Sequence, residues 1–408
     1  MTTGGTRTSI AATVMAVLTF AAQVLTTACD SDHDATPTGS PSTTLAEQAP
    51  VARPSCEAAL PAAWRQAIEG SAVSTGGVST DVLAVGPAGE VVAVRDNGDT
   101  RDLLLIGADK TVTEIYEVPE PDRNDVGSVA MDDRWIVVGV DRIPRGANGV
   151  LNSIIRIDVI DRQNGSVRTV AQRSDDDYLV GDNGIDTVAL FDGKAYWTAF
   201  VSDEYGRGTG IVRSFDLGTG AEADVASGDI GDVRATATGL TWTAGGRRGY
   251  PDVNMWGRAK VQIAAPLPLP VADALHTGPD RLSLATDGTV YAWLTGVDRG
   301  GTGVAWWSPE SGVVRVSGDV VRVTDVLPPV YVVGSYVVID KHRQGDTADQ
   351  DTLATVVDVR SGAVTFLNQY VAGVDGGTIG IRLRTGPGKL ADSIAGVLRS
   401  DALPPIFC

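Results

Sequence analysis

Hydrophobic and polar residues alternate with a period of two along most of the chain after about residue 79, and the clearest example is the stretch 281–316 (RLSLATDGTVYAWLTGVDRGGTGVAWWSPESGVVRV). Four short apolar runs are separated there by two tight turns and one glycine-rich loop, Gly296 to Gly303. The pair Asp287-Gly288 has the composition of a type I′ hairpin, and Ser311-Gly312 forms the second turn. The pattern predicts a four-stranded antiparallel meander of roughly 40 residues, the size of one propeller blade.

The same unit recurs along the chain. Turns between a first and a second apolar run fall at seven places: Ala88-Gly89, Asp132-Asp133, Asp192-Gly193, Thr238-Gly239, Asp287-Gly288, Gly334-Ser335 and Asp375-Gly376. Turns between a third and a fourth run keep the same phase: Asp109-Lys110, Asn164-Gly165, Thr219-Gly220, Ser311-Gly312 and Ser361-Gly362. We therefore predict an all-β fold, a seven-bladed β-propeller of four-stranded antiparallel blades with one short N-terminal helix.

Two details refine this prediction. Pro266, Pro268 and Pro270 stand where the last strand of the fourth blade is expected, and proline there fits only an outer edge strand. Three of the first turns are followed by an aromatic residue on the second strand: Tyr196, Trp242 and Tyr291. These side chains could stack on a ligand or pack between neighbouring blades. We favour packing, because large side chains at alternating strand positions fill the space between twisted sheets.

The segment Glu57–Glu69 (EAALPAAWRQAIE) predicts the helix that precedes the repeats. Pro61 suits a first helical turn, Trp64 and Ile68 recur at helical spacing, and Gly70 ends the pattern. We expect this helix to pack against the repeat domain with Trp64 as its anchor.

Composition and charge narrow the class of protein. The chain has 408 residues, 43% of them hydrophobic, but 48 glycines and 20 prolines divide it into short pieces, which disfavours long helices. The net charge of −18 disfavours a nucleic-acid partner, because such a partner is normally held by a clustered basic surface.

The N-terminus has the features of an export signal. Residues 1–28 carry Arg7 as their one charge, followed by the apolar run Ile10 to Leu25, which is too short to span a membrane. The stretch before Cys29 resembles a bacterial lipoprotein signal, in which the cysteine is acylated and becomes the mature N-terminus. Plain cleavage after Ala28 is the alternative. The polar residues up to about 55 then predict a flexible tether.

The three cysteines are Cys29, Cys56 and Cys408, and an odd number in an exported chain needs an explanation. Acylation of Cys29 leaves an even pair, of which one member precedes the repeats and the other ends the chain. We predict a Cys56–Cys408 disulfide that ties the first and last blades together.

By its turns and its second strands, such as TVYAW, the region from Asp81 to Cys408 resembles the bacterial extracytoplasmic β-propellers with TolB-like, WD40-like or quinoprotein-like repeats, including actinobacterial propeller lipoproteins. The Trp-Asp dipeptide of eukaryotic WD40 blades is absent. This resemblance implies a fold and no particular function.

Catalytic motifs are not found in the sequence. A Ser-His-Asp triad would need His276 or His342, and no G-x-S-x-G elbow presents a serine. The run Asp175 to Asp177 near Asp182 lacks the alternating oxygen ligands of a known calcium loop. Glycine-rich stretches such as Gly206 to Gly210 precede no helix that could hold a phosphate. We therefore predict no catalytic residue, no metal site and no cofactor.

Arginines recur in the loops between second and third strands, which a propeller presents on one face: Arg95, Arg101, Arg142, Arg145, Arg207, Arg247, Arg248, Arg299, Arg343 and Arg384. Six of them make our candidate binding set for an anionic ligand or an acidic protein loop: Arg145, Arg207, Arg248, Arg299, Arg343 and Arg384. Neighbouring aspartates such as Asp96 and Asp298 support an alternative, in which the arginines join adjacent blades by ion pairs.

The sequence thus predicts a signal peptide over 1–28, a tether over 29–55, a helix and lead-in strand over 56–78 and a propeller over 79–408. The predicted function is an extracytoplasmic binding or scaffolding module, monomeric and held at the cell membrane by its lipid, with an unknown protein or anionic ligand as partner. The alternative is an extracytoplasmic hydrolase or lyase that uses carboxylates or a metal at the central funnel. Inward carboxylates or histidines in that funnel favour the enzyme, whereas a valine- and alanine-lined channel favours the binding module.

Overall fold

A computed structural model describes residues 51–143, 154–172, 181–202, 208–228, 230–244, 260–263, 266–277, 284–295, 302–321, 329–340, 354–384 and 393–408. The chain divides into the units Met1–Glu47 and Gln48–Cys408, and the first lies outside the described residues, as do the predicted signal peptide and Cys29. None of the described helices is long and apolar enough to cross a membrane.

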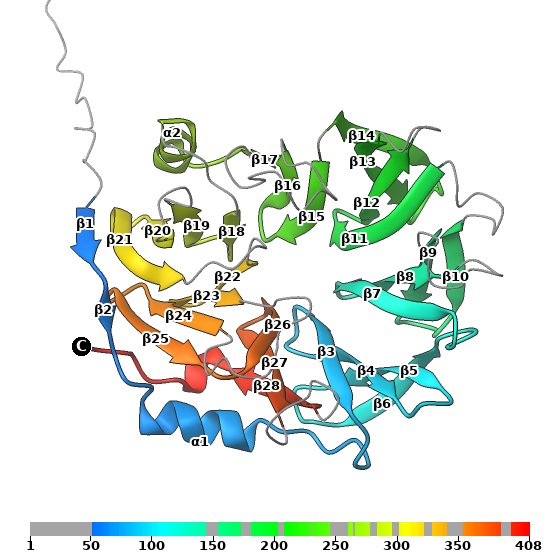
Figure 1. Cartoon of the computed structure of the whole chain (residues 1–408), viewed down its shortest axis with the longest axis horizontal. Helices are drawn as coiled ribbons and strands as arrows, with labels where there is room; N and C mark the ends of the chain where they lie inside the picture. Colours follow the sequence, from blue (N-terminus) through cyan, green and yellow to red (C-terminus); the bar gives the residue numbers. More distant parts are fainter. Residues whose placement is uncertain are drawn as a thin grey trace, which may run out of the picture. The chain divides into compact units, whose positions relative to one another are not determined.

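The described strands of residues 48–408 are arranged as blades around a centre (Figure 1). The first blade comprises β3 (Thr80–Val85), β4 (Val91–Asp96), β5 (Arg101–Ile106) and β6 (Val112–Glu117). The second comprises β7 (Asn124–Met131), β8 (Trp135–Arg142), β9 (Ile154–Asp161) and β10 (Val167–Gln172). The third comprises β11 (Gly181–Phe191), β12 (Lys194–Ser202), β13 (Gly208–Asp216) and β14 (Glu222–Gly228). A single pairing, Asn183 with Ile154, links the second and third blades into one eight-stranded sheet.

The remaining blades differ in the number of their strands. The fourth blade comprises β15 (Ile230–Thr236), β16 (Gly239–Ala244) and β17 (Lys260–Ile263), and the fifth comprises β18 (Leu284–Thr286), β19 (Tyr291–Thr295), β20 (Thr302–Ser308) and β21 (Gly312–Val321). The sixth comprises β22 (Val330–Val333), β23 (Tyr336–Asp340), β24 (Ala354–Asp358) and β25 (Ala363–Leu367). The seventh comprises β26 (Tyr370–Asp375), β27 (Thr378–Arg384) and β28 (Ser393–Arg399). Within each blade the strands run antiparallel. The predicted all-β propeller is confirmed, and these strands are consistent with seven blades, although two blades have three described strands rather than four.

Side chains from neighbouring blades form the core. In the fifth blade, Trp306 and Trp293 are both 0% exposed but belong to different clusters, because alternate strand positions point to opposite faces. Trp306 packs with Val337 and Ile339 of the sixth blade. Burial of an aromatic side chain of this size contributes at most roughly 5 kcal/mol. Tyr196 and Tyr291 are likewise buried, which confirms packing as their role.

The proline-containing segment of the fourth blade is a helix, and our expectation of an edge strand there was wrong. Helix α2 spans Leu269–Thr277, with Pro268 just before it and Pro270 in its first turn, where a missing backbone N–H costs nothing. Val271 and Ala274, three positions apart, are buried in the same cluster as Trp293. The chain therefore has a second helix besides the predicted N-terminal one.

Three of the turns between first and second strands differ in backbone conformation. Gly288 has φ +93° but Asp287 does not have a positive φ, so this hairpin is not the expected type I′ turn. Asp192 and Gly193, at φ +49° and +70°, do adopt that conformation. At the last first-to-second-strand turn, Gly376 and Gly377 take it, one residue later than predicted.

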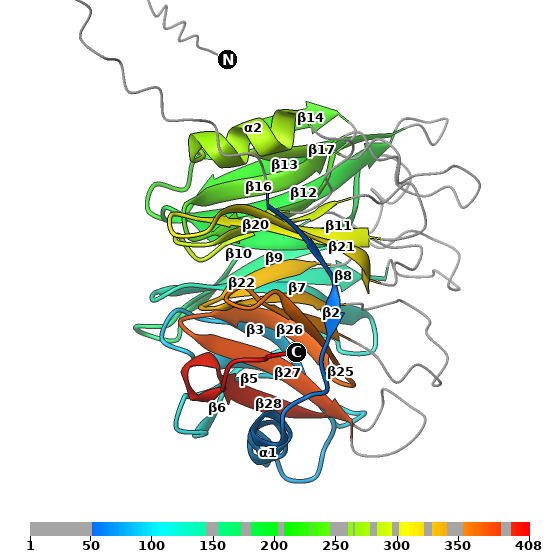
Figure 2. The same ribbon diagram turned by 90° about the vertical axis from the view of Figure 1, so that its left-hand side faces the viewer.

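The N-terminal segment follows the outer edges of three consecutive blades (Figure 2). Strand β1 (Val51–Pro54), inside the segment predicted as tether, pairs in parallel with β21, and β2 (Cys56–Glu57) pairs in parallel with β25. Helix α1 (Ala62–Gly70) follows, and Ala72 then forms an antiparallel bridge with Gly396 of β28. Through this bridge the segment after α1 lies at the outer edge of the last blade before the chain enters β3.

The C-terminal tail is docked on the sixth blade beside this segment. Trp64 of α1 is 0% exposed, meets the ring of Tyr336 edge-on at 5.1 Å and donates its indole N–H to the Pro404 carbonyl at 3.0 Å. The backbone N–H of Ile406 donates to the buried carboxylate of Asp358 at 2.9 Å, just after the short 3-10 helix Ser400–Ala402. These contacts confirm that Trp64 anchors the helix.

Cys56 and Cys408 form the predicted disulfide, with their Cα atoms 6.2 Å apart. The bond covalently joins the segment that enters the first blade to the end of the chain.

Candidate functional site

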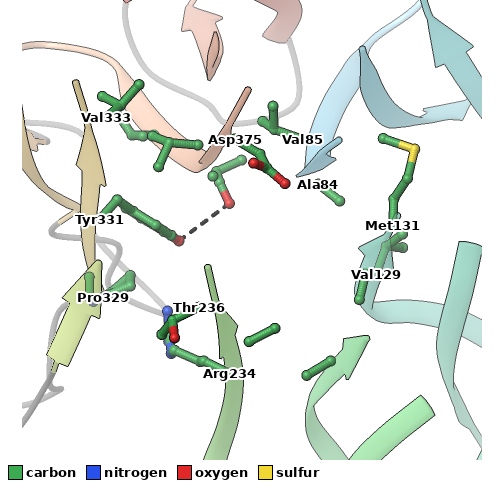
Figure 3. Close-up of a pocket in the computed structure, with 18 of the residues that line it drawn as sticks. Ala84, Val85, Val129, Met131, Arg234, Thr236, Pro329, Tyr331, Val333 and Asp375 are labelled. Atoms are coloured by element: carbon green, nitrogen blue, oxygen red, sulfur yellow. Dashed lines mark hydrogen bonds between the residues drawn. The ribbon is translucent and has the colours of Figure 1, made fainter. Parts of the chain in front are cut away.

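The first strands of the blades, β3, β7, β11, β15, β18, β22 and β26, line a central channel of about 1240 Å³. Figure 3 shows side chains from several of these strands directed into it, including Val129, Tyr331 and Asp375. Because each first strand continues into a tight turn at the same end of the ring, the channel has one end formed by these turns and another formed by the strand beginnings.

Valine, alanine and glycine predominate in the lining, and no histidine occurs among the described lining residues. The charged side chains are five aspartates and two arginines: Asp132, Asp133, Asp287, Asp340, Asp375, Arg234 and Arg382. Among the residues that the structure describes, no group of three histidines, cysteines or carboxylates could hold a metal ion. The wall is therefore largely apolar, with a few charged groups at defined places.

Four of the aspartates lie at the turn end of the channel, and we call this group the acidic mouth: Asp132, Asp133, Asp287 and Asp375. Asp132 Oδ1 accepts the backbone N–H groups of Arg134 and Trp135, so it shapes its own turn. Asp287 does the same for Thr289 and Val290.

Asp375 is the most perturbed group of the acidic mouth. Its side chain is exposed to the channel, but the surrounding turns crowd it. Burial raises the pKa of the Asp375 carboxyl, the Gly376 backbone N–H that it accepts at 2.7 Å lowers it, and the negative charges of Glu90 and Asp133 raise it again. The net result is a raised pKa whose main cause is burial, with smaller contributions from Glu90 of the first blade and Asp133 of the second.

Glu90 lies behind this mouth, at the end of the turn that carries the lining residue Pro87. Its side chain is 8% exposed, and Oε1 accepts a short hydrogen bond from Arg162 of the next blade. Its other oxygen, Oε2, is buried with no hydrogen-bond partner among the described residues. The turn packs tightly here, because a Cβ on Gly376 would lie 1.9 Å from the Pro87 carbonyl oxygen.

Besides Arg162, two further arginines near the acidic mouth have partners. Arg134 pairs with Asp161 at 3.4 Å and lies 4.5 Å over the ring of Trp135. Arg399 pairs with Asp401 at 3.4 Å and donates to the Gly376 carbonyl at 3.4 Å. Arg234 also lines the channel, two residues before the end of β15, so it offsets part of the negative charge of the four aspartates.

The opposite end of the channel contains a balanced pair. Arg382 lies 3.0 Å from Asp81 of the first blade, and its guanidinium carbon lies 5.9 Å from the centre of the Tyr370 ring. Tyr331, from the sixth blade, donates its hydroxyl to the Ala372 carbonyl of the seventh at 3.3 Å (Figure 3). These contacts join neighbouring blades as well as lining the channel.

Most of the predicted arginine set lies outside the described residues: Arg145, Arg207, Arg248, Arg299 and Arg343. Arg384, the sixth member, is half-buried at the end of β27. The two first-blade arginines form ion pairs: Arg95 with Asp102 at 2.7 Å, and Arg101 with Asp96 at 2.6 Å. Arg101 also reaches Asp125 of the second blade at 3.1 Å, so for this residue the ion-pair alternative holds.

A polar cluster joins the first two blades. Asp158 is 0% exposed and accepts hydrogen bonds from Tyr116 of the first blade at 2.5 Å and from Arg156 at 2.8 Å, while Thr169 donates to its other oxygen at 2.6 Å. Burial is the main cause that raises the pKa of Tyr116. Since all partners are satisfied, the cluster serves to hold the ring together.

The aspartates of the acidic mouth were predicted from the sequence only as turn residues. Asp132-Asp133, Asp287-Gly288 and Asp375-Gly376 were recognised as first turns, but their shared charge at one end of the ring was missed. The signal was present, because all first turns of a propeller lie on one face. His276, the one described histidine, is exposed on α2 and does not line the channel.

The fold and channel define the protein as a β-propeller. No family model matches the chain, and no curated protein matches it. It is similar to a solved oligogalacturonate lyase from Vibrio parahaemolyticus, with 12% identity and a TM-score of 0.46 over 80% of this chain and 95% of that one. The Neurospora crassa Pan2 WD40 domain is 8% identical, with a TM-score of 0.44 over 82% of this chain and 93% of that one. A streptogramin B lyase is 11% identical, with a TM-score of 0.42 over 81% of this chain and 96% of that one.

Proposed function

We propose that this protein is an extracytoplasmic binding module whose ligand site is the central channel. The observation that carries the proposal is the lining: about 1240 Å³ of space, walls of valine, alanine and glycine, and a small number of charged groups grouped at one end. Small-molecule sites typically combine an apolar wall with a few polar groups of this kind. A rigid ring also positions such a site with little loss of entropy on binding.

The location outside the cytoplasm is supported by two features. The apolar run before Cys29 is typical of an export signal with lipid attachment, and the Cys56–Cys408 disulfide suits an oxidising compartment. We propose that the lipid on Cys29 holds the protein at the cell membrane, and that residues between it and β1 let the propeller reach its ligand.

A channel-filling variant tests the proposal. Ala235 on β15 lines the channel and is exposed to it, so Ala235→Phe fills space without displacing core residues. Ala223→Phe, on the exposed outer strand β14, is the matched control. In a thermal-shift screen of small molecules with the full chain, we expect stabilising compounds whose effect is lost in Ala235→Phe and kept in Ala223→Phe. Compounds that stabilise both variants equally, or no stabilising compound at all, would contradict the channel as the site.

A second candidate function is a hydrolase or lyase that uses carboxylates of the funnel. One observation favours it: the pKa of Asp375 is raised in a cleft beside two further carboxylates, as in many general acids. In that case a ligand found in the screen is converted to product by the wild type and recovered unchanged with Asp375→Asn. Recovery of the unchanged ligand from both proteins supports the binding module.

The candidate arginines form a separate proposal, a face for an anionic partner. Five of these arginines lie outside the described residues, so this proposal rests on their sequence positions after the second strands.

A further inference from the structure

We propose that the outer edge of β21 is an interaction surface for a second copy of this chain, and that β1 closes this surface by pairing with it. β21 is the outermost strand of the fifth blade, so the surface is separate from the channel, which the first strands of the blades line. β1 thereby keeps the protein monomeric.

The outer strands of four blades have features that discourage pairing with another chain. β6, β10 and β14 have no further strand beside them among the described residues, and each carries one extra residue opposite its neighbouring strand: Ile115, Val170 and Val225. Such β-bulges distort the row of backbone N–H and C=O groups that a new strand would need. β17, the outer strand of the fourth blade, has only four residues, and a short edge is also a poor template.

The strands that the N-terminal segment covers have no such bulge. Residues 312–316 of β21 pair with β20 in unbroken register, as do β25 with β24 and β28 with β27. β1 lies beside β21, β2 lies beside β25, and Ala72 lies beside β28 (Figure 2). The regular edges are therefore the ones that the chain covers with its own N-terminal segment. This is the expected arrangement if an uncovered regular edge pairs with another chain.

β1 covers its edge without adding to the core. Val51 is 48% exposed, Ala52 and Pro54 are exposed as well, and none of the β1 residues belongs to a described hydrophobic cluster. Arg53 donates to the Ser361 carbonyl of the sixth blade at 3.4 Å, which holds β1 in place. The main contribution of β1 is therefore its backbone pairing with β21.

The register shows which backbone groups of β1 face β21. Ser55, directly after β1, donates its N–H to the Ser317 carbonyl at 3.1 Å, and groups on one side of a strand recur at every second residue. The N–H of Arg53 therefore faces β21, whereas the N–H of Ala52 and the nitrogen of Pro54 face away. Because Pro54 has no N–H, the outward edge of β1 is itself a poor template for another strand.

Without β1, the edge of β21 is complementary to itself. The Ser317 carbonyl faces β1, and the N–H of Ser317 and the backbone groups of Arg315 point to the same side. Two β21 strands can pair antiparallel across a twofold axis, with Arg315 of each copy opposite Ser317 of the other, so that both residues regain their backbone hydrogen bonds. In this register the two arginines are not opposite each other, so like charges do not oppose the pairing. A second copy of this chain therefore fits the edge.

Proline substitutions in the full chain test the interface. Arg53→Pro removes the N–H that faces β21 and should detach β1, while the Cys56–Cys408 disulfide and α1 keep the rest of the segment in place. Light scattering after size exclusion should give the monomer mass for the wild type at all concentrations. For Arg53→Pro we expect a mass that rises toward twice that value as the concentration increases. Ala52→Pro, at a position whose N–H faces away from β21, is the matched control and should remain monomeric. Arg53→Gln, which removes the charge and keeps the N–H, should also remain monomeric.

A second substitution locates the contact on β21. Ser317→Pro removes an N–H that faces β1, so the double variant Arg53→Pro/Ser317→Pro should be monomeric again. Amide hydrogen exchange gives an independent readout. In Arg53→Pro, the amides of Arg315 and Ser317 should exchange rapidly at low concentration and become protected as the dimer forms.

The outcomes decide the role of β1. A folded Arg53→Pro variant that stays monomeric, or a dimer that Ser317→Pro does not dissociate, overturns the inference. Equal association of Ala52→Pro and Arg53→Pro overturns it as well. If the melting curve shows that Arg53→Pro does not fold, Val51→Pro removes the other N–H of β1 that faces β21, and the same outcomes apply to it.

Discussion

The Cys56–Cys408 disulfide allows a quantitative test of how the ring is closed. The two cysteines are 352 positions apart in the chain. A cross-link over a loop of that length removes unfolded-state entropy worth about 5 to 6 kcal/mol in the chain-entropy model, and native disulfides typically contribute about 2 to 4 kcal/mol. We expect Cys408→Ser to destabilise the fold by an amount in this lower range.

The corresponding change in melting temperature follows from the size of the domain. Globular proteins gain about 2.1 cal/mol/K of entropy per residue on unfolding, so a ring of about 350 residues loses roughly 1.4 °C for each kcal/mol. Cys408→Ser should therefore lower Tm by about 3 to 6 °C. Differential scanning calorimetry of the full chain measures this directly, with the wild type in reducing agent as a second route to the same state.

The double variant is the control. Cys56→Ser, Cys408→Ser and the double variant should lose the same stability, because each removes the same bond. Contacts such as those of Trp64 with Pro404 and of Ile406 with Asp358 remain, so the native fold should persist. A Tm unchanged in Cys408→Ser, or losses that add in the double variant, would refute the reasoning.

Three further predictions follow from the charged and polar groups. The raised pKa of Asp375 makes its ionisation less favourable in the folded state than in the unfolded state, so Asp375→Asn should raise Tm at about pH 7. This gain in Tm should shrink as the pH falls toward the ordinary pKa of 3.8, and an equal gain at both pH values would contradict the raised pKa. Tyr116→Phe removes a donor to the buried carboxylate of Asp158 and should cost about 1.5 to 3 kcal/mol in urea unfolding, whereas a change below the error of the measurement would mean that the hydroxyl contributes nothing. A fatty-acid analogue should label the wild type in cells and not Cys29→Ala, and equal labelling would disprove the lipid anchor.

The fold was accessible from the sequence because blade structure is local. Alternation with period two and turns such as Asp192-Gly193 specify hairpins without reference to distant residues. The disulfide was accessible from the number of cysteines, because acylation of Cys29 leaves one pair. Helix α2 was missed because Pro268 and Pro270 are compatible with an edge strand as well as with a helical first turn, and only packing against the fifth blade decides between them.

The candidate site was less accessible, since it depends on the ring rather than on any one hairpin. Asp133 and Asp375 are 242 positions apart, and they line one channel only when the ring places the seventh and second blades on either side of the first. Their identity as turn residues concealed their second property, a shared negative field. The parallel pairing of β1 and β2 on the outside of two blades was also unpredicted, because short polar segments carry no alternating pattern.

The most direct test of the account is the position, in crystals of the full chain, of a compound that stabilises the wild type and not Ala235→Phe. We predict that it lies in the central channel against the valine and alanine wall. A compound bound only outside the channel would contradict the account.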